Sequence, residues 1–529
     1  PADPIYDVTS ADKKGELSRQ ENNNWSWNGK AMFYYNHVFG NHFINATAGG
    51  EVSESESESL SYILNGFQLG NMHEPQFAAT QANPVNVSES KTRKIGFLAS
   101  VNYAYNDIYL FDGSFRLDGS SDFGRDKQFA PFWSVGVGLN VHNYDFLKGH
   151  WLISRLKVRA SYGATGNVGF APYTAITTFQ TATDAWFFTG PAASLMALGN
   201  SRLTWQTTYK LDVGFNIGLL NDKITLEGSY YRNETEDLID DVKIPAYSGF
   251  TSYKENSGST LNEGFEIAVT STLFQNKDWM VTFMANLSSN RSKITELSEE
   301  MNAYNETILA EYEKEDSEYR DVLSRPLMLY YKGKSLSSIY AVRSEGIDPA
   351  NGRERFIKKN GMSTYTWDAN DQVVVGDTEP DAKGPFGINV GWKGITLNAY
   401  FNYQWGGQSY NSTLADKVEN AQISTQNVDK RVLSARWKNA GDVVPYYDLS
   451  KNPTQNPTSR FVQDDNRLDF TSLSIGYDFS RQLISKWKLK SLSVQFSAND
   501  LCKWRSVKEE RAINYPFARS FSFSLNVGF

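Results

Sequence analysis

The sequence predicts an all-β protein that crosses a membrane as an antiparallel β-barrel. Apolar and polar residues alternate along many short segments, which is the pattern of strands with one apolar and one polar face. Short and long connections between these segments alternate strictly, so all long connections fall at one end of the sheet, as in barrels with tight periplasmic turns and long extracellular loops. A soluble β-sandwich or solenoid with one buried face is the alternative, but it gives no reason for this order.

The end of the chain, SFSFSLNVGF, shows the alternation most clearly. Phe521, Phe523, Leu525, Val527 and Phe529 occupy every second position, with serine, asparagine and glycine between them. Similar runs elsewhere bring the number of predicted strands to fifteen: 29–38, 44–52, 95–105, 109–117, 133–141, 156–162, 211–219, 224–230, 265–273, 279–287, 386–392, 395–405, 473–479, 492–498 and the closing strand. Tryptophans at strand ends, Trp133, Trp279, Trp392 and Trp405, are typical of the aromatic girdle of such a barrel.

Composition and charge exclude several classes of protein. No segment approaches the roughly eighteen apolar residues of a transmembrane helix. The net charge of −8 argues against a nucleic-acid partner, which needs a concentrated basic face. The single cysteine, Cys502, excludes an internal disulfide and a cysteine-based metal site. The chain opens PADPIYDV, without an initiator methionine or an apolar leader, and this predicts a processed or incomplete chain.

The segment SESESES after Val52 tests the predicted lipid-facing register. It would place Glu54, Glu56 and Glu58 on the outer face, where charge in lipid is costly. Because residues 44–52 already supply the length that a tilted strand needs, we expect the glutamates to stand above the membrane on an extended strand.

An odd number of antiparallel strands cannot close a barrel by pairing its first strand with its last, and open edges do not occur in lipid. We therefore expect at least one wall strand to come from outside this sequence. We expect residues 1–28 to be an extracellular loop segment and residues 29–529 to be the C-terminal part of the barrel. The predicted long extracellular loops are 53–94, 118–132, 163–210, 231–264, 288–385, 406–472 and 499–520.

Local motifs, taken in order along the chain, resemble one family, the SusC-like TonB-dependent outer-membrane transporters of Bacteroidetes-type bacteria. RLDGSSDFG at 116–124 is similar to the family's hairpin motif, and LKVRASYGATGN at 156–167 to its following strand. The segment from LTWQTTYK to ETEDLI resembles another family region, with Gln206 where glutamate is usual. The match continues through NSGSTLNEGFEI (256–267), VVVGDTEPDAKGPFG (373–387), YQWGGQSYN (403–411), ARWKNAGD (435–442) and DNRLDFTSLSIGYDF (465–479).

The resemblance implies a barrel of twenty-two strands around an N-terminal plug, of which this chain would form about the last fifteen, with the plug domain not in this chain. It also implies import of oligosaccharides or oligopeptides together with a SusD-like surface lipoprotein that acts as a lid. Energy would come from the TonB complex through the missing N-terminal part, and two transporter–lid pairs could form a dimer. The terminal Phe529 would be the aromatic that the barrel-assembly machinery recognises.

Candidate binding residues fall into two groups. Loop aromatics in polar surroundings suit stacking on sugars or peptide side chains, or packing against a lid: Trp186, Phe187, Phe188, Tyr365 and Trp367. Charged residues on the lumenal face form a mixed row, Asp112, Arg116 and Asp118, and a basic row, Arg155, Lys157 and Arg159. For these rows we expect salt bridges between wall and plug rather than solute contact. The stretch 296–320 predicts an acidic helix in the longest loop.

Catalysis finds no support in the sequence. The five histidines have no spacing typical of metal ligands, and no nucleophilic triad or GxxxxGK phosphate loop is recognisable. We therefore predict a protein that is not an enzyme and needs no cofactor. The alternatives to an importer are a passive diffusion porin, closed by a further strand around 173–179, and a structural or adhesive surface barrel.

Overall fold

The computed structural model describes residues 15–67, 74–82, 85–124, 127–187, 190–243, 252–314, 323–425, 427–448, 455–508 and 519–529. Within these ranges no helix is long and apolar enough to cross a membrane.

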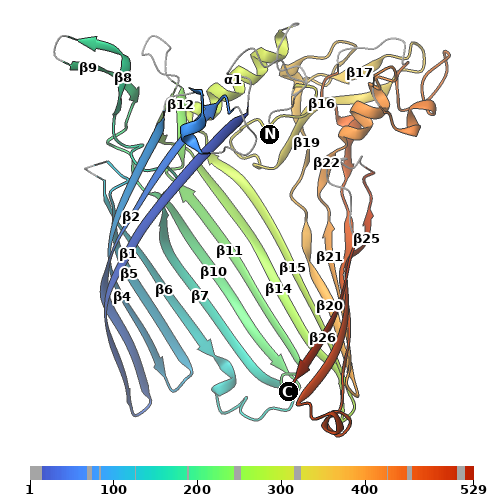
Figure 1. Ribbon diagram of the computed structural model, residues 1–529. Helices are drawn as coiled ribbons and strands as arrows, with labels where there is room; N and C mark the ends of the chain where they lie inside the picture. Colours follow the sequence, from blue (N-terminus) through green and yellow to red (C-terminus); the bar gives the residue numbers. More distant parts are fainter. Residues whose placement is uncertain are drawn as a thin grey trace.

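One large antiparallel sheet forms the wall, and it confirms the fifteen predicted strands. Each wall strand pairs with the next wall strand along the chain. The sheet curves round so that the first strand, in blue, and the last, in red, form its two edges (Figure 1). The strands are β1 (Glu16–Phe39), β2 (His42–Asn65), β4 (Asn86–Tyr105), β5 (Tyr109–Ser120), β6 (Phe129–Asn140), β7 (Ile153–Asn167), β10 (Gln206–Leu219), β11 (Ile224–Glu236), β14 (Ser259–Gln275), β15 (Trp279–Glu296), β20 (Ala382–Trp392), β21 (Ile395–Trp405), β24 (Arg467–Asp478), β25 (Ser491–Arg505) and β26 (Ser520–Gly528).

Short and long connections alternate as predicted. The β4–β5 turn has Asn106 and Asp107 at φ of 55° and 54°, and the β20–β21 turn has Lys393 and Gly394 at 44° and 93°. Consecutive residues with positive φ make the tight hairpin turns whose twist matches that of the flanking strands. In Figure 1 these turns lie at the lower end of the wall with the C-terminus, and the long loops gather at the upper end.

The outer face of the wall is apolar and exposed, which is the arrangement of a barrel in lipid. Along β26 the residues Phe521, Phe523 and Leu525 are 62%, 71% and 59% exposed. Trp279 and Trp392 face each other across β15 and β20 beside the lower turns, with ring centroids 5.3 Å apart. This pair fits the predicted girdle. The predicted role of Phe529 as an assembly signal is not tested by its exposure and stays a prediction.

Several wall strands are longer than predicted. Residues 16–28 belong to β1 instead of a loop, and β1 pairs with β2 from Glu16↔Asn65 to Phe39↔His42. Residues 53–65 and 86–94 of the predicted loop 53–94 likewise belong to β2 and β4. The prediction ended each strand where the apolar alternation ended, but backbone pairing needs no apolar side chains once the strand has left the membrane. The strand extension expected for the SESESES segment is confirmed.

The long loops fold into smaller elements above the wall. These are β3 (Thr80–Gln81), β8 (Thr178–Phe187), β9 (Gly190–Ala197), β12 (Ile239–Lys243), β13 (Ser252–Asn256), α1 (Glu299–Glu313), β16 (Ser338–Ile347), β17 (Glu354–Ile357), β18 (Ser363–Thr364), β19 (Gln372–Asp377), β22 (Gln408–Tyr410) and β23 (Val462–Asp464), while the short helix α3 (Arg481–Ile484) lies in a lower turn. The predicted acidic helix is α1, which begins after Ser298, whose side chain accepts from the amide of Met301. The further wall strand considered around 173–179 is absent from the described sheet, because Thr178 onward pairs with β9 in a separate hairpin.

Candidate functional site

The cap, which we define as residues 338–377 together with the described residues of 406–465, is a unit above the wall. Its two parts meet where β16 runs beside residues 457–459. The amide of Val342 donates to the carbonyl of Pro457 at 3.3 Å, and the amide of Ser344 donates to Oγ of Ser459 at 3.0 Å. Two loops far apart in the sequence are thereby joined by backbone contacts.

The cap encloses a cavity of about 350 Å³ between β17, the turn at 365–367, the helical turn Leu414–Glu419 and residues 455–461. Aromatic rings and amide groups line it beside four charged residues, a composition that suits a small solute. The lining residues are Gly352, Arg353, Glu354, Phe356, Tyr365, Trp367, Glu419, Asn420, Tyr447, Gln455, Asn456, Thr458, Arg460 and Phe461.

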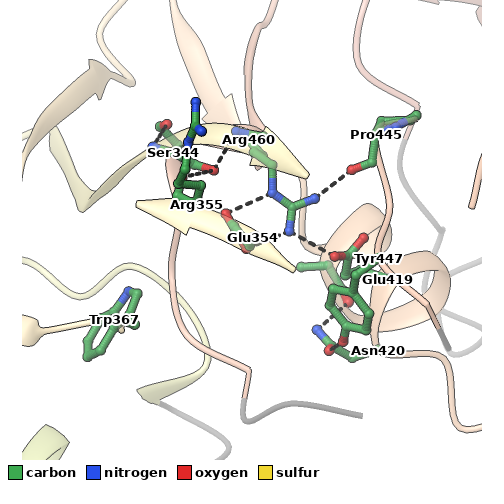
Figure 2. Close-up of polar contacts among 12 residues, drawn as sticks. Ser344, Glu354, Arg355, Trp367, Glu419, Asn420, Pro445, Tyr447 and Arg460 are labelled. Atoms are coloured by element: carbon green, nitrogen blue, oxygen red, sulfur yellow. Dashed lines mark hydrogen bonds and ion pairs between the residues drawn. The ribbon is translucent and has the colours of Figure 1, made fainter. Parts of the chain in front are cut away.

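Arg460 lies at the centre of a buried ion-pair network in this cavity (Figure 2). Its Nε and Nη2 donate to the two oxygens of Glu354 at 2.8 and 2.7 Å, and Nη2 also donates to Oε1 of Glu419 at 2.8 Å. Its Nη1 donates to the carbonyl of Pro445 at 2.7 Å. A two-pronged guanidinium–carboxylate pair is among the strongest hydrogen-bonded arrangements in proteins, so this residue fixes the relative positions of three loop segments.

A second arginine, Arg436, holds the backbone that carries Glu419. Its guanidinium donates to the carbonyls of Val418 and Glu419, the second at 3.1 Å, and to the carbonyl of Tyr447 at 3.1 Å. The carbonyls of Val418 and Glu419 lie at the C-terminal end of the helical turn, where backbone acceptors lack partners and a cation is favourable.

Two polar atoms among the lining residues have no hydrogen-bond partner in the described structure. These are Oε2 of Glu419, a residue that is 1% exposed, and Oγ1 of Thr458. Burial raises the pKa of the Glu419 carboxyl, and the charge and hydrogen bond of Arg460 offset only part of this increase. Both atoms are also closed off from solvent, so a ligand in the cavity would contact the accessible parts of the lining residues rather than these two atoms.

Tyr365, one of the predicted contact residues, lies at the rim of the cavity. Its hydroxyl donates to the carboxylate of Asp348, which keeps the pKa of that carboxyl below its usual range. The guanidinium of Arg353 lies 4.9 Å from the centre of the tyrosine ring. Tyr365 as a whole residue is 37% exposed, so part of it remains open to a solute.

Trp367, also predicted as a contact, lies deeper. Its indole Nε1 donates to the carbonyl of Pro457 at 3.2 Å, and its ring lies 5.2 Å from that of Tyr312 in α1. It packs against a cluster of buried residues formed by Tyr312, Leu323 and Ala369. Trp367 therefore lines the cavity and also packs against buried residues. The prediction that it is a loop aromatic available for contact did not include this packing role.

The remaining predicted loop aromatics belong to another part of the loop region. Trp186 and Phe187 end β8, whose hairpin with β9 stands on the opposite side of the loop region from β16 and β17 (Figure 1). Phe188 lies outside the described residues.

The mixed lumenal row forms an ion-pair network within the wall. Arg116 pairs with Glu51 of β2, and its Nε lies 2.6 Å from Oδ1 of Asp118, while Lys30 of β1 lies 3.1 Å from Glu51. Four wall residues on three strands are thereby linked without a plug. Asp112 has no ion pair among the described residues. It occupies the space beside Gly136, where an added Cβ would lie 1.9 Å from its carboxylate.

The basic row is also partly neutralised by the wall. Arg159 lies 3.5 Å from Asp212 of β10, and Arg155 lies 3.2 Å from Asp222 in the β10–β11 turn. Lys157 has no ion pair in the described part of the chain. These wall-to-wall pairs could not be read from the sequence, because Asp212 and Asp222 belong to the next hairpin. They do not test the expected contact of the two rows with a plug, which stays a prediction.

Two hollows lie on the lumenal side of the wall, beside the charged residues of the two rows. One, of about 320 Å³, is lined by Glu51, Lys94, Arg116, Asp118 and Trp205 among others, and another, of about 360 Å³, by Arg159, Glu227, Glu266 and Lys383 among others. Both place charges of opposite sign along the inner wall, so the lumen offers a polar path below the cap. Among the described residues, no group of three His, Cys, Asp or Glu side chains is placed to hold a metal ion.

Sequence reasoning missed Glu354, Glu419 and Arg460. They come from three different loop segments, separated by up to 106 positions, and none carries a local motif. Only the fold brings them together.

Comparison with known proteins places the chain among outer-membrane receptors. Residues 5–420 match the family model described as TonB dependent receptor-like, beta-barrel. TonB-dependent receptor P3 of Formosa agariphila is 25% identical, with 99% of this chain and 54% of that protein covered. TonB-dependent receptor SusC of Bacteroides thetaiotaomicron is 23% identical, with 89% of this chain and 46% of that protein covered. The chain thus spans about half the length of the curated relatives it matches.

Solved structures show the same fold. The RagAB peptide importer in its open-open state superimposes with a TM-score of 0.79 at 22% identity, with 97% of this chain and 55% of that chain covered. Its closed-closed state gives a TM-score of 0.77 at 23% identity, with 92% and 53% covered.

Proposed function

Because this chain belongs to the TonB dependent receptor-like β-barrel family of the outer membrane, we propose that it forms the wall and loops of an importer for oligosaccharides or oligopeptides. The cap cavity would receive part of the solute, and the charged lumenal face would guide it inward. Membership of the family supports a role in transport. The cavity, with its aromatic, amide and charged lining residues, supports the proposal of solute contact.

The same relatives support a proposal for the partners. One relative bears the name SusC, and the RagAB structures are described as a peptide importer. We propose that a SusD-like lipoprotein closes over the cap of this protein. A plug and the remaining wall strands would come from an N-terminal part of the same transporter, which the TonB complex would pull, and two transporter–lid pairs would form a dimer.

Cavity chemistry is compatible with both proposed solute classes. Stacking on Tyr365 and hydrogen bonds to Asn420 and Gln455 suit a sugar ring, and the same amides suit a peptide backbone. Two glutamates and two arginines balance formally to zero charge in the lining, so a neutral solute portion fits better than a strongly charged one.

Uptake of labelled oligosaccharides and oligopeptides by whole cells tests this function. We expect accumulation of one of the two classes that requires both this chain and the proton gradient, and that falls several-fold in Tyr365→Ala. Met362→Ala is the matched control, since Met362 is exposed in the same loop and does not line the cavity. Uptake that persists without the proton gradient would replace the importer with a passive porin, and no uptake of either class would favour a structural surface barrel.

A further inference from the structure

The connection between β24 and β25, at the lower end of the wall, is unusually basic (Figure 1). Its residues 480–490, which we call the basic turn, read SRQLISKWKLK and include no acidic residue, although the whole chain has a net charge of −8. Its cations are all exposed and have no ion pair within the described residues: Arg481, Lys486, Lys488 and Lys490. The lower end of such a barrel faces the periplasm, so uncompensated positive charge is concentrated there at one point.

Lysines in two other lower turns are paired with aspartates. Lys148 Nζ lies 3.3 Å from Asp145 in the β6–β7 connection, and Lys393 Nζ lies 3.7 Å from Asp278 of a neighbouring turn. The acidic residue that precedes the basic turn is Asp478. It follows the outward Tyr477 in β24, so alternation places it on the lumenal face. The cations of the basic turn are therefore available to an anion outside this chain.

The basic turn also exposes large apolar side chains. It consists of α3, a 3₁₀ turn at Ser485–Trp487 and the three residues that lead into β25. Ile484 is 1% exposed and anchors the turn, whereas Leu483 and Trp487 are 46% and 59% exposed. Exposed leucine and tryptophan beside clustered cations are typical of segments that lie in a membrane interface.

Strand register directs one end of the basic turn toward lipid. Leu492 of β25 pairs with Val527, which belongs to the exposed apolar face of β26. Lys490 lies two residues before Leu492, and its amide donates to the carbonyl of Gly528 at 2.7 Å, so the pairing with β26 continues to this residue. Alternation then places the Lys490 side chain on the same outward face as Leu492.

The depth of the basic turn follows from the aromatic residues before it. Tyr477 and Phe479 end the outward stripe of β24, with ring centroids 4.7 Å apart. Aromatic residues at the ends of barrel strands form the girdle at the membrane interface. The basic turn directly follows Phe479, so it lies just beyond this girdle. That position is the headgroup layer, which is about 5–8 Å thick on each side of the hydrocarbon core.

We propose that the basic turn binds an anionic phospholipid of the inner leaflet of the outer membrane. Phospholipids form this leaflet, so phosphate groups lie at the depth of the turn. The cations of the turn hold the phosphate, while Leu483 and Trp487 reach the boundary of the acyl chains. The proposal depends on the outer-membrane location of the chain and not on the proposed solute, so loss of lipid binding and loss of uptake are separate results.

Native mass spectrometry of the purified protein, with any chain that copurifies, tests this proposal. The protein is placed in nanodiscs of equimolar phosphatidylglycerol and phosphatidylethanolamine and then released. We expect phosphatidylglycerol to be retained in preference by about fivefold or more, since one cation at an anionic lipid surface corresponds to about fivefold. Lys486→Gln combined with Lys488→Gln should bring the two lipids to nearly equal retention. Lys486→Arg combined with Lys488→Arg keeps the charge and should keep the preference.

A matched control separates the basic turn from general effects of charge. Lys148→Gln combined with Lys277→Gln removes two cations from other lower turns, where each lysine has an aspartate beside it, Asp145 or Asp278. This variant should retain the lipids as the unaltered protein does.

Photocrosslinking locates the bound lipid. Benzoylphenylalanine in place of Trp487 should crosslink to phosphatidylglycerol, and the same residue in place of the exposed Met362 of the cap should not. Equal retention of the two lipids by the unaltered protein, which an acidic protein partner at the basic turn would give, would overturn the proposal. An unchanged preference in the double glutamine variant, or no lipid crosslink at position 487, would also overturn it.

Discussion

At the scale of single residues, Arg460 and its two carboxylates decide how the cap is held together. Glu354 and Arg460 are 12% and 11% exposed, and Glu419 is almost fully buried. Buried charges are tolerated only when they are paired, so the loops must keep the geometry that pairs them. Loop aromatics at 365 and 367 could be predicted from composition, but the ion pairs could not, because they join segments with no local signal.

Replacing Arg460 with methionine should loosen the cap strongly. The change leaves two buried carboxylates without their cation, which costs about 3–5 kcal/mol when one partner of a buried pair is removed. Hydrogen exchange of residues 354–357 and 414–419 should show this loss as faster exchange. Arg355→Met is the control, because Arg355 pairs with Glu345 at the surface and should change the exchange little. Unchanged exchange in Arg460→Met would show that the network does not hold the cap.

The raised pKa of Glu419 predicts how cap stability depends on pH. The contribution of the Glu419 carboxyl to the stability of the folded cap is fully present below its ordinary pKa of 4.5. It is lost as pH rises through the higher pKa of the folded state. Opening of the 414–419 turn, corrected for the intrinsic pH dependence of exchange, should therefore become easier as pH rises above 4.5. Glu419→Gln should remove this slope. If cap stability instead increased with pH, the charge of Arg460 rather than burial would be the larger influence on the pKa of Glu419.

At the scale of elements, the period-two pattern predicted all fifteen wall strands and the order of their connections. It worked because lipid on one face and water on the other impose alternation along every crossing strand. Strand ends were predicted poorly. Residues 16–28 and 53–65 pair as strands above the apolar zone, where water accepts either kind of side chain and the sequence loses its alternation signal.

Arginine on the two faces of β26 should have different effects. Phe523→Arg places a charge on the lipid face, where it costs about 2–4 kcal/mol near the bilayer midplane. Ser522→Arg places the same residue on the lumenal face of the same strand and should cost much less. Urea unfolding of the barrel in lipid vesicles measures both. Equal destabilisation by the two variants would contradict the assignment of the faces.

At the scale of the whole molecule, the sheet has fifteen strands in its path and two edges, β1 and β26. Within the described residues, β1 pairs only with β2 and β26 only with β25, so one side of each edge strand has no partner, although exposed backbone groups are not tolerated in lipid. We therefore expect further strands to complete the wall in the membrane.

The most direct test is denaturing electrophoresis with peptide mass mapping of the protein, purified from outer membranes under conditions that keep native complexes intact. The account predicts plug peptides and about seven further wall strands with this sequence, either on the same polypeptide or on one that accompanies it. A solitary chain of this sequence that nevertheless forms a closed, heat-modifiable barrel would contradict it, and the diffusion porin would then be the better description.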